Sequence, residues 1–405
     1  MTTAPQERVG VWLIGARGSV ATTTVAGRAA LTAGLHPPTG LVTAGPAFAE
    51  AGLPALDQLV FGGHDTNPTP LPKRAEQLAE AGVLPAGLPG AVAADLARAD
   101  AEIRPGGPQP ADPRDDRELV AAFTADLTAF AASHRLARTV VVHLGSTEPV
   151  PAADDPRAPA SALYAAAAIE AGCAYVNFTP ATGMHAPGLA DRAARAGLPH
   201  AGRDGKTGQT LLRAVLAPMF AQRALAVRAW SGTNLLGGGD GATLADPGAA
   251  AAKNAGKARA LADNLGHTPE GTTHIDHVPA LGDWKTAWDH IAFDGFLGTR
   301  MVLQTIWQGC DSALAAPLVL DLVRLLARAH QLGLAGPVPG LGFFFKDPDR
   351  LGPPAGPDAA AGPAGPARSG PAGADPALDA FAGPAGLAEQ YQALLGLAER
   401  LAASS

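Results

Sequence analysis

The chain has 405 residues, of which 47% are hydrophobic and 17% are charged, and its formal net charge is −7. This length predicts two domains, or one domain with a large insertion, in a globular soluble protein with ample core. The acidic balance and the lack of a basic block argue against nucleic acid as a partner. The N-terminus is polar until Val9 and no apolar run is long enough to span a membrane, so we expect a cytoplasmic protein without a secretory signal.

A glycine-containing turn follows the first apolar run of the chain. Val9 to Ile14 form that run, which predicts a strand, and Thr22 to Ala33 predict a helix. Strand, glycine turn and helix in this order are the context of a dinucleotide fingerprint, where backbone N–H groups and the helix N-terminus hold the pyrophosphate. The candidate cofactor-binding residues of the turn are Gly15, Ala16, Arg17, Gly18, Ser19 and Val20. Arg17 and Val20 stand where the usual pattern has glycines, so a tight turn of some other α/β protein stays an alternative.

Three further strands are predicted at Thr39–Thr43, Leu59–Asp65 and Arg138–Gly145. Asp65 is the last residue of the run Leu59–Asp65, where its carboxylate could bind the ribose of a cofactor or cap the following loop. His143 lies inside the strand predicted at Arg138–Gly145 and is interpreted as a hydrogen-bonded core residue. Between them, residues 66–115 predict helices with irregular connections, and residues 116–135 predict an amphipathic helix.

Polar residues follow two of the central strands. Ser146, Thr147 and Glu148 come after the strand that ends at Gly145, and Thr179 comes after a strand at 174–178. Ligands of open α/β sheets bind beyond the carboxyl ends of the strands, so these residues are candidate cofactor contacts, with helix capping as the alternative. With helices at 161–171 and 187–197, the β–α alternation predicts a mostly parallel doubly wound sheet.

The stretch from residue 202 to residue 285 contains four of the six lysines of the chain, against 24 arginines. An amine can be tuned by burial to transfer protons, whereas a guanidinium stays charged. Lys253 and Lys257 are four apart on a helix predicted at 249–265, so an anion between them is a natural explanation. The alternative is that these are ordinary surface lysines. The glycine-rich loop 232–241 suits a phosphate, or is a flexible turn.

The rest of the second half predicts a helix at 210–223, strands at 225–231, 274–277 and 289–306, and helices at 309–330 and 385–403. The histidines His274 and His277 have no third ligand at metal spacing, so no metal site is predicted. Residues 347–384 are mostly Pro, Gly and Ala and are expected to be disordered.

Taken together, the motifs of the chain resemble the inositol-1-phosphate synthase (inositol-3-phosphate synthase) family over nearly the whole length, apart from 347–384. The motifs that carry the resemblance are Phe61-Gly-Gly-His-Asp65, Ser146-Thr-Glu-Pro149, Val176-Asn-Phe-Thr-Pro180, Gly202-Arg-Asp-Gly-Lys-Thr-Gly-Gln-Thr210, Asn234-x-x-Gly-x-x-Asp-Gly241, Lys253-x-x-x-Lys257, Gly282-Asp-Trp-Lys285 and Asp311-Ser-x-Leu-Ala-Ala-Pro317.

The resemblance implies an α/β fold: a Rossmann-like doubly wound parallel sheet with an inserted α+β domain for catalysis and tetramerisation. The implied division is a first part of the NAD-binding domain at 1–209, the inserted domain at 210–311, and a return to the Rossmann domain at 312–405. NAD is the implied cofactor, a sugar phosphate the implied substrate, and a homotetramer the implied assembly.

The family reaction converts glucose 6-phosphate to a cyclitol phosphate by oxidation at C5, enolisation, ring closure onto C1 and reduction, without net redox change. By resemblance, Lys253 and Lys285 carry the C5 proton transfer, while Lys257 and Lys346 hold the phosphate and stabilise the oxyanion at C1. The aspartates implied to hold and tune these amines are Asp204, Asp283 and Asp311. The implied substrate-binding residues are Lys206, Ser231, Asn234, Gly237, Gly238, Gly239 and Lys257, and Asp204 and Asp240 are implied to contact the cofactor.

Gly238 and Gly239 replace side-chain amides of the family pattern, which leaves substrate choice open. One alternative is a relative that cyclises fructose 6-phosphate to a cyclopentane cyclitol phosphate. The others are a simple dehydrogenase on the same fold and a non-catalytic NAD-binding protein.

Overall fold

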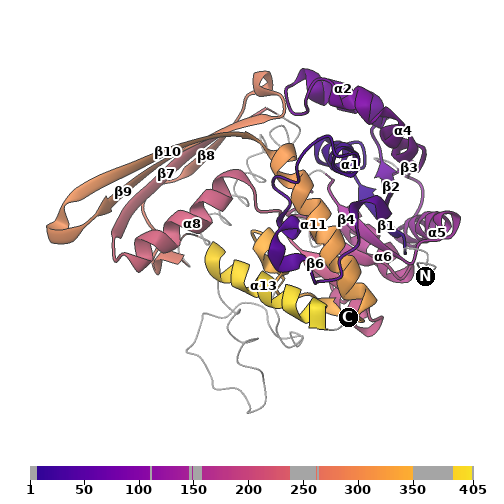
Figure 1. Cartoon of the computed structure of the whole chain (residues 1–405). Coiled ribbons are helices and arrows are strands. Elements are labelled where there is room, and N and C mark those ends of the chain that lie inside the picture. Colours follow the sequence, from indigo (N-terminus) through magenta and orange to yellow (C-terminus); the bar gives the residue numbers. More distant parts are fainter. Residues whose placement is uncertain are drawn as a thin grey trace, which may run out of the picture.

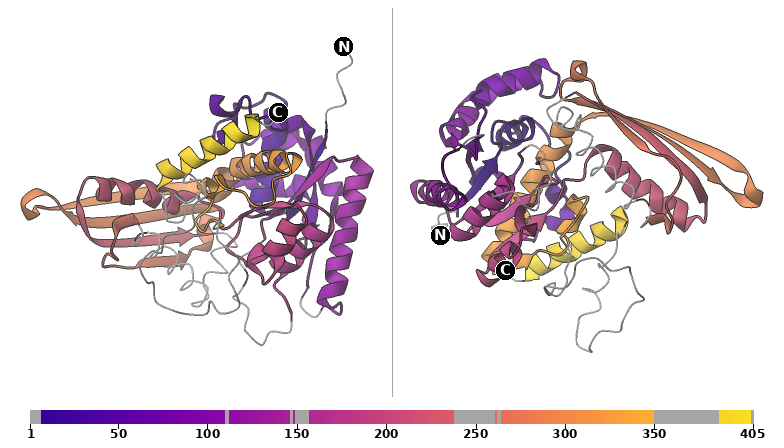
Figure 2. Two further views of the ribbon diagram at one scale, coloured as in Figure 1. Left: turned by 90° about the horizontal axis from the view of Figure 1, so that it is seen from below. Right: turned by 180° about the vertical axis from the view of Figure 1, so that it is seen from behind.

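The computed structural model describes residues 7–109, 112–145, 148, 157–237, 261, 264–349 and 386–403. These residues form two sheets with helices around them. One sheet lies inside a shell of helices, and the other extends away from it as a long curved blade (Figures 1 and 2). Within the described residues, no helix is both long enough and apolar enough to cross a lipid bilayer.

The first sheet has seven strands in the order β11-β6-β5-β4-β1-β2-β3, and all of its strand pairs are parallel. Its strands are β1 (Val9–Ile14), β2 (Leu59–Asp65), β3 (Ile103–Pro105), β4 (Arg138–His143), β5 (Ala174–Asn177), β6 (Pro199–Gly202) and β11 (Gly336–Pro337). The order reverses next to β1, as in a Rossmann fold, and this confirms the predicted doubly wound parallel sheet.

Alternating side chains of β1 enter two different cores. Val11 joins the core with α1 and α11, while Trp12 joins the core with α5 and α6. The helices around this sheet are α1 (Ser19–Thr32), α2 (Leu71–Glu80), α3 (Leu88–Ala91), α4 (Ala93–Ala101), α5 (Asp116–His134), α6 (Ala160–Glu170), α7 (Leu189–Arg195), α11 (Asp311–Gln331) and α13 (Leu387–Ala403). Strands covered on both faces read as continuous apolar runs, and for this reason β1, β2, β4 and β5 were visible in the sequence.

The second sheet has four strands in the order β10-β9-β7-β8. They are β7 (Ala226–Leu236), β8 (Thr273–His277), β9 (Trp284–Asp294) and β10 (Arg300–Cys310). Helix α8 (Gly208–Gln222) packs on one face through Phe220, which meets Trp230 and Ile291 in a small core. The predicted strand 289–306 is therefore a hairpin of two strands, paired from Trp284 with Cys310 to Asp294 with Arg300.

One predicted strand is wrong. Residues 39–40 form a turn rather than a strand, and a short 3-10 helix, Val42–Ala44, follows Leu41. The cause is Asp321 of α11, whose buried carboxylate accepts hydrogen bonds from the backbone N–H groups of Val42 (2.9 Å) and Thr43 (2.8 Å). Those N–H groups would otherwise be available to a neighbouring strand. Strands β3 and β6 were missed, because three or four residues are too short to show a period.

Candidate active site

Lys285 and Asp311 form an ion pair where the second sheet meets α11. Lys285 is the second residue of β9, and its register partner is Gly309 of β10. Strand β10 ends at Cys310, and Asp311 then opens α11, so the hairpin itself brings the two side chains together. The Nζ of Lys285 donates to Oδ2 of Asp311. A carboxylate in the first turn of a helix is stabilised by the helix dipole, which favours an ionised Asp311 as the partner.

Lys346 and Asp204 form a second pair at the edge of the first sheet. The Nζ of Lys346 donates to Oδ1 of Asp204 at 2.8 Å, and both side chains are about one-fifth exposed, at 23% and 20%. The backbone also pairs here, because the N–H of Lys346 donates to the carbonyl of Asp204 at 2.7 Å. One step further along, Arg203 binds the carboxylate of Asp347 at 2.8 Å. This ladder between two distant segments holds the lysine against its aspartate.

The segment from Asp204 to Gly208 connects the two lysine–aspartate pairs. Its first residue binds Lys346, and a Cβ at Gly208 would lie 3.5 Å from Oδ1 of Asp311. Asp204 and Gly208 both have positive φ angles, 61° and 54°, which bend the chain sharply between the pairs. The structure therefore brings Asp204, Asp311, Lys285 and Lys346 of the predicted catalytic set to one segment.

Lys206, a predicted substrate contact, lies against α13. Its side chain is buried, and its Nζ donates to Oε1 of Gln390 on α13. Burial lowers the pKa of Lys206 to about 7, since a charged amine is costly to desolvate. The sequence offers no signal for Gln390, because it lies beyond the Pro- and Gly-rich stretch and reaches Lys206 only through tertiary packing.

Asn234 belongs to a buried polar network that links the second sheet to α8. Its amide donates to Oε1 of Gln209 at 2.6 Å, and the amide of Gln209 donates to Asp289 at 2.8 Å. Arg213 and Trp230 donate to the other oxygen of Asp289 at 2.7 and 2.8 Å. Arg213 and Asp289 were not predicted as site residues, and Gln209 appeared only within the motif Gly202–Thr210.

Ser231 and Gly237 do not join this network. Strand residues alternate between faces, so Ser231 lies on the side of β7 opposite to Asn234. Gly237 packs against the backbone of Gly282, where a Cβ would lie 2.5 Å from its nitrogen and oxygen. This close approach requires glycine at Gly237 for backbone packing.

The glycine turn after β1 fits the diphosphate of a dinucleotide. Gly15 has a φ of 82° and lies against the backbone of Gly145, and a Cβ at Gly63 would overlap the carbonyl of Leu13. Gly18 is the N-cap of α1 and, among the described residues, no side chain caps it. The helix begins with Ser19, Val20 and Ala21, so its first turn has no acidic residue. Its N–H groups and dipole are thus available to an anion.

Arg17 and Asp65 stabilise this turn. The backbone N–H of Arg17 donates to Oδ2 of Asp65 at 2.6 Å, and the N–H of Asn67 donates to Oδ1 at 2.7 Å. Asp65 thus has the loop-capping role that the sequence left open. The Nε of Arg17 donates to Oδ1 of Asp100 at 2.9 Å, so the guanidinium is held by a residue of α4.

Thr179 and His143 are buried beside one another after β4 and β5. The hydroxyl of Thr179 donates to Oδ1 of Asn177 at 2.9 Å and lies 3.3 Å from Nδ1 of His143. Burial lowers the pKa of His143 to about 4, so the ring is neutral near pH 7. This confirms the prediction of a core histidine. Glu148 accepts hydrogen bonds from the N–H and the hydroxyl of Ser161, at the start of α6, and so has the capping role.

Asp283, predicted to tune the lysine amines, binds a serine and an arginine of the first half of the chain. Its Oδ1 accepts a hydrogen bond from Ser19 at 2.7 Å, and its Oδ2 lies 3.6 Å from Arg74. Asp283 therefore contacts the start of α1, at the cofactor end of the first sheet. The remaining predicted site residues lie outside the described residues: Ser146, Thr147, Gly238, Gly239, Asp240, Lys253 and Lys257. The same is true of residues 350–384 of the predicted disordered segment.

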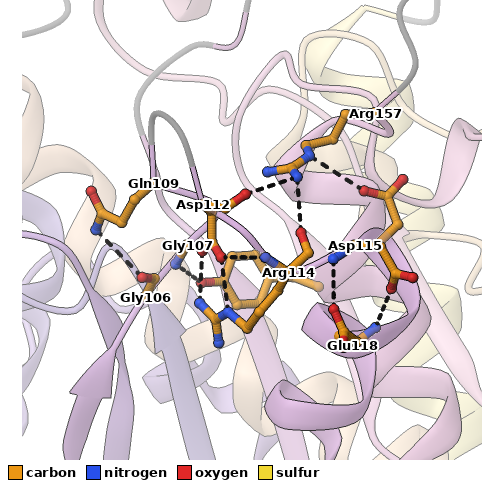
Figure 3. Close-up of polar contacts among 10 residues, drawn as sticks. Gly106, Gly107, Gln109, Asp112, Arg114, Asp115, Glu118 and Arg157 are labelled. Atoms are coloured by element: carbon orange, nitrogen blue, oxygen red, sulfur yellow. Dashed lines mark hydrogen bonds and ion pairs between the residues drawn. The ribbon is translucent and has the colours of Figure 1, made fainter.

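A polar cluster fastens the connection from β3 to α5 (Figure 3). Asp112 binds Arg114, which holds the pKa of that carboxyl well below its usual range, and Arg157 donates to the carbonyl of Arg114 at 2.9 Å. Asp115 and Glu118 form a capping box at the start of α5. Its side chains bind one another and nearby backbone groups, which indicates a structural role. Among the described residues, no group of three or more His, Cys, Asp or Glu is placed to hold a metal ion.

Comparison with known proteins places these features in context. A family model described as myo-inositol-1-phosphate synthase matches residues 208–312. Inositol-3-phosphate synthase 1 of Bacteroides thetaiotaomicron is 31% identical over 388 residues, covering 84% of this chain and 89% of that protein. A Trypanosoma brucei inositol-3-phosphate synthase is 36% identical over 184 residues, covering 42% of this chain and 34% of its own.

Two solved structures share the fold. The inositol-3-phosphate synthase of Caenorhabditis elegans aligns with a TM-score of 0.76 at 19% identity, covering 98% of this chain and 86% of its own. A myo-inositol-1-phosphate synthase-related protein of Thermotoga maritima aligns with a TM-score of 0.69 at 24% identity, covering 84% of this chain and 93% of its own. The expected Rossmann-like architecture with a second sheet is thereby confirmed.

Proposed function

The chain belongs to the inositol-3-phosphate synthase family and is an enzyme of this type, an intramolecular cyclase, and we propose that it converts glucose 6-phosphate to an inositol phosphate with NAD as its cofactor. One observation carries the proposal. A single bent segment, Asp204 to Gly208, contains the aspartate of one lysine–aspartate pair and approaches the aspartate of the other. A reaction that develops charge at two separated carbons needs two such cationic centres.

The glycine turn supports a dinucleotide at the carboxyl edge of the first sheet. The turn from Gly15 to Val20 would hold the diphosphate with backbone N–H groups and the N-terminus of α1. Bound there, NAD⁺ would supply the acceptor for a hydride from the sugar, and its reduced form would supply that hydride to the cyclised ketone. Of the other predicted cofactor contacts, Asp65 acts through the turn that it caps.

Lys285 is the proposed acid–base group at the C5 hydroxyl. Its Nζ would take the hydroxyl proton during oxidation and return it during reduction. Asp311 orients the amine and stabilises the ammonium ion, because it binds Nζ directly and has no need to move. Lys253 is the second predicted group for this transfer, and that assignment remains a prediction.

Lys346 is the proposed electrostatic centre for the oxyanion that forms at C1 when the ring closes. Asp204 holds its Nζ in place, so the positive charge is oriented before the reaction begins. We assign phosphate binding to Lys257 together with Lys346. Lys206, buried against Gln390, would fix the segment from Asp204 to Gly208 on α13.

We propose a cytoplasmic homotetramer in which residues 1–209 and 312–405 bind the cofactor and contribute Asp204 and Lys346 to the active site, while residues 210–311 contribute Lys285, Asp311 and the subunit contacts. The contact surface would be the face of the second sheet that α8 does not cover. Val302 and Ile306 lie on it with 55% and 73% of their surface exposed, beside Trp288 in register with Ile306. Apolar surface of this kind is typical of subunit interfaces.

Phosphorus NMR tests the function directly. The purified chain is incubated with NAD⁺ and glucose 6-phosphate and, in parallel, with fructose 6-phosphate. We expect an inositol phosphate from the first and no steady gain in NADH absorbance, since the hydride returns to the product. Net accumulation of NADH would indicate a simple dehydrogenase, a cyclitol phosphate from fructose 6-phosphate would indicate the alternative substrate, and NAD binding without turnover would indicate a binding protein.

A further inference from the structure

Three side chains from separate parts of the chain meet at the first turn of α1. Arg74 of α2 donates from Nη2 to the hydroxyl of Ser19 at 2.7 Å. Ser19 in turn donates to Oδ1 of Asp283 at 2.7 Å, and the same Nη2 of Arg74 lies 3.6 Å from Oδ2 of Asp283. Each member thus contacts the other two. Arg74 was no part of the predicted site, and the proposed mechanism does not use it.

The contact is a junction between the two sheets, near the end of the second sheet that lies beside α2 (Figures 1 and 2). Next to Asp283, the indole of Trp284 donates to the carbonyl of Ala81, the C-cap residue of α2, at 2.8 Å. The preceding residue, Gly282, has a φ of 58° and packs on Gly237. The loop before β9 is therefore attached to α2 at two points, and Lys285 follows immediately.

The charges at this junction would affect the binding of an anionic cofactor. Asp283 carries a negative charge to the N-terminus of α1, where the backbone is arranged to receive a diphosphate. An unpaired carboxylate there would repel the diphosphate. Arg74 is a cation that faces this carboxylate, and 25% of the arginine side chain is exposed against 19% for Asp283. Arg17, which is two residues before Ser19 in the sequence, forms an ion pair with Asp100 instead.

We propose that Arg74 is a positioning residue that neutralises Asp283 beside the cofactor diphosphate, and that through Asp283 it fixes the loop that delivers Lys285. This rests on the proposed dinucleotide site. Arg74 couples the two sheets: it keeps the junction closed while an anion occupies the start of α1. Without Arg74, the same Asp283 becomes a repulsive group at the binding site.

A double-mutant cycle on the full-length chain tests the charge argument. The variants are Arg74→Gln, Asp283→Asn and the two combined, with NAD⁺ affinity measured by titration calorimetry and folding checked by thermal melting. We expect Arg74→Gln to weaken NAD⁺ binding about tenfold, because it exposes the diphosphate to a like charge. Adding Asp283→Asn should restore affinity to within about threefold of wild type, and the loss in Arg74→Gln should shrink at high salt.

The control is Arg98→Gln, which removes the same charge from an exposed ion pair with Asp95 on α4 and should leave NAD⁺ affinity unchanged. Equal weakening in Arg74→Gln and in the double variant, or normal affinity in Arg74→Gln, overturns the inference. A wild-type chain that binds no NAD⁺ would instead contradict the proposed function, so the two failures are distinguishable.

Discussion

The two sheets bury their side chains in different ways. Strands β1 and β5 are buried at every position, because helices pack on both faces of the first sheet. Strands β7 and β9 alternate, because α8, together with Leu261 and Leu265, packs on one face of the second sheet. The first sheet completes its own core, while the second leaves an apolar face. The lysine–aspartate pair of Lys285 and Asp311 lies where the two architectures join.

This difference indicates that the two sheets have different functions. A sheet covered on both faces makes a rigid platform for a cofactor at its carboxyl edge. A sheet with one free face can contribute catalytic groups at its base and subunit contacts along its length. The following experiments test that difference, from the largest expected effect to the smallest.

Replacing Lys285 by Met should abolish turnover without removing cofactor binding. The second sheet supplies this amine, whereas the first sheet supplies the glycine turn. We expect kcat to fall at least about 10³-fold, as for loss of a general acid–base group that also stabilises charge. Steady-state kinetics and NAD⁺ titration measure the two effects separately. The exposed Lys73 on α2 is a matched control, and Lys73→Met should retain full activity. An active Lys285→Met variant would refute the assignment.

Replacing Arg213 by Met should destabilise the second sheet, because it leaves Asp289 charged and buried without its cation. Breaking a buried pair from one side costs roughly 3–5 kcal/mol. The matched control is Arg228→Met, which breaks an ion pair with Asp294 on the same strand where the arginine is 69% exposed, and should cost less than about 1 kcal/mol. Urea unfolding measures both. Equal losses would mean that burial does not set the strength of these pairs.

Much of this fold could be predicted, because strands buried on both faces read as apolar runs and α5 begins with a capping box in the sequence. The charged site residues Lys285, Lys346, Asp204 and Asp311 came from motif resemblance. What could not be predicted depends on contacts between distant segments. Arg74 meets Asp283 across more than two hundred residues, and no local pattern marks either as the other's partner.

Replacing Ile306 by Lys should weaken self-association while leaving each subunit folded. The side chain lies on the uncovered face of the second sheet and is 73% exposed in the single chain. Burying a lysine there would cost about 10- to 100-fold in association. Size-exclusion chromatography with light scattering measures the assembly. The control is Leu35→Lys, an exposed apolar residue after α1 that should not change it. An unchanged assembly in Ile306→Lys would place the subunit contacts elsewhere.

Replacing His143 by Gln should make the free energy of unfolding fall less steeply as the pH is lowered from 7 to 5. The folded pKa of about 4 lies below the ordinary histidine value of 6.5. The neutral ring's contribution is therefore complete above pH 6.5 and is lost as pH falls toward 4. Between pH 7 and pH 5, wild type should lose about 1–2 kcal/mol more than the variant. His274 of the second sheet is exposed, so His274→Gln should keep the wild-type slope. Parallel slopes for wild type and His143→Gln would mean that water reaches the first sheet at this position, and the contrast between a closed and an open sheet would then fail at a buried histidine.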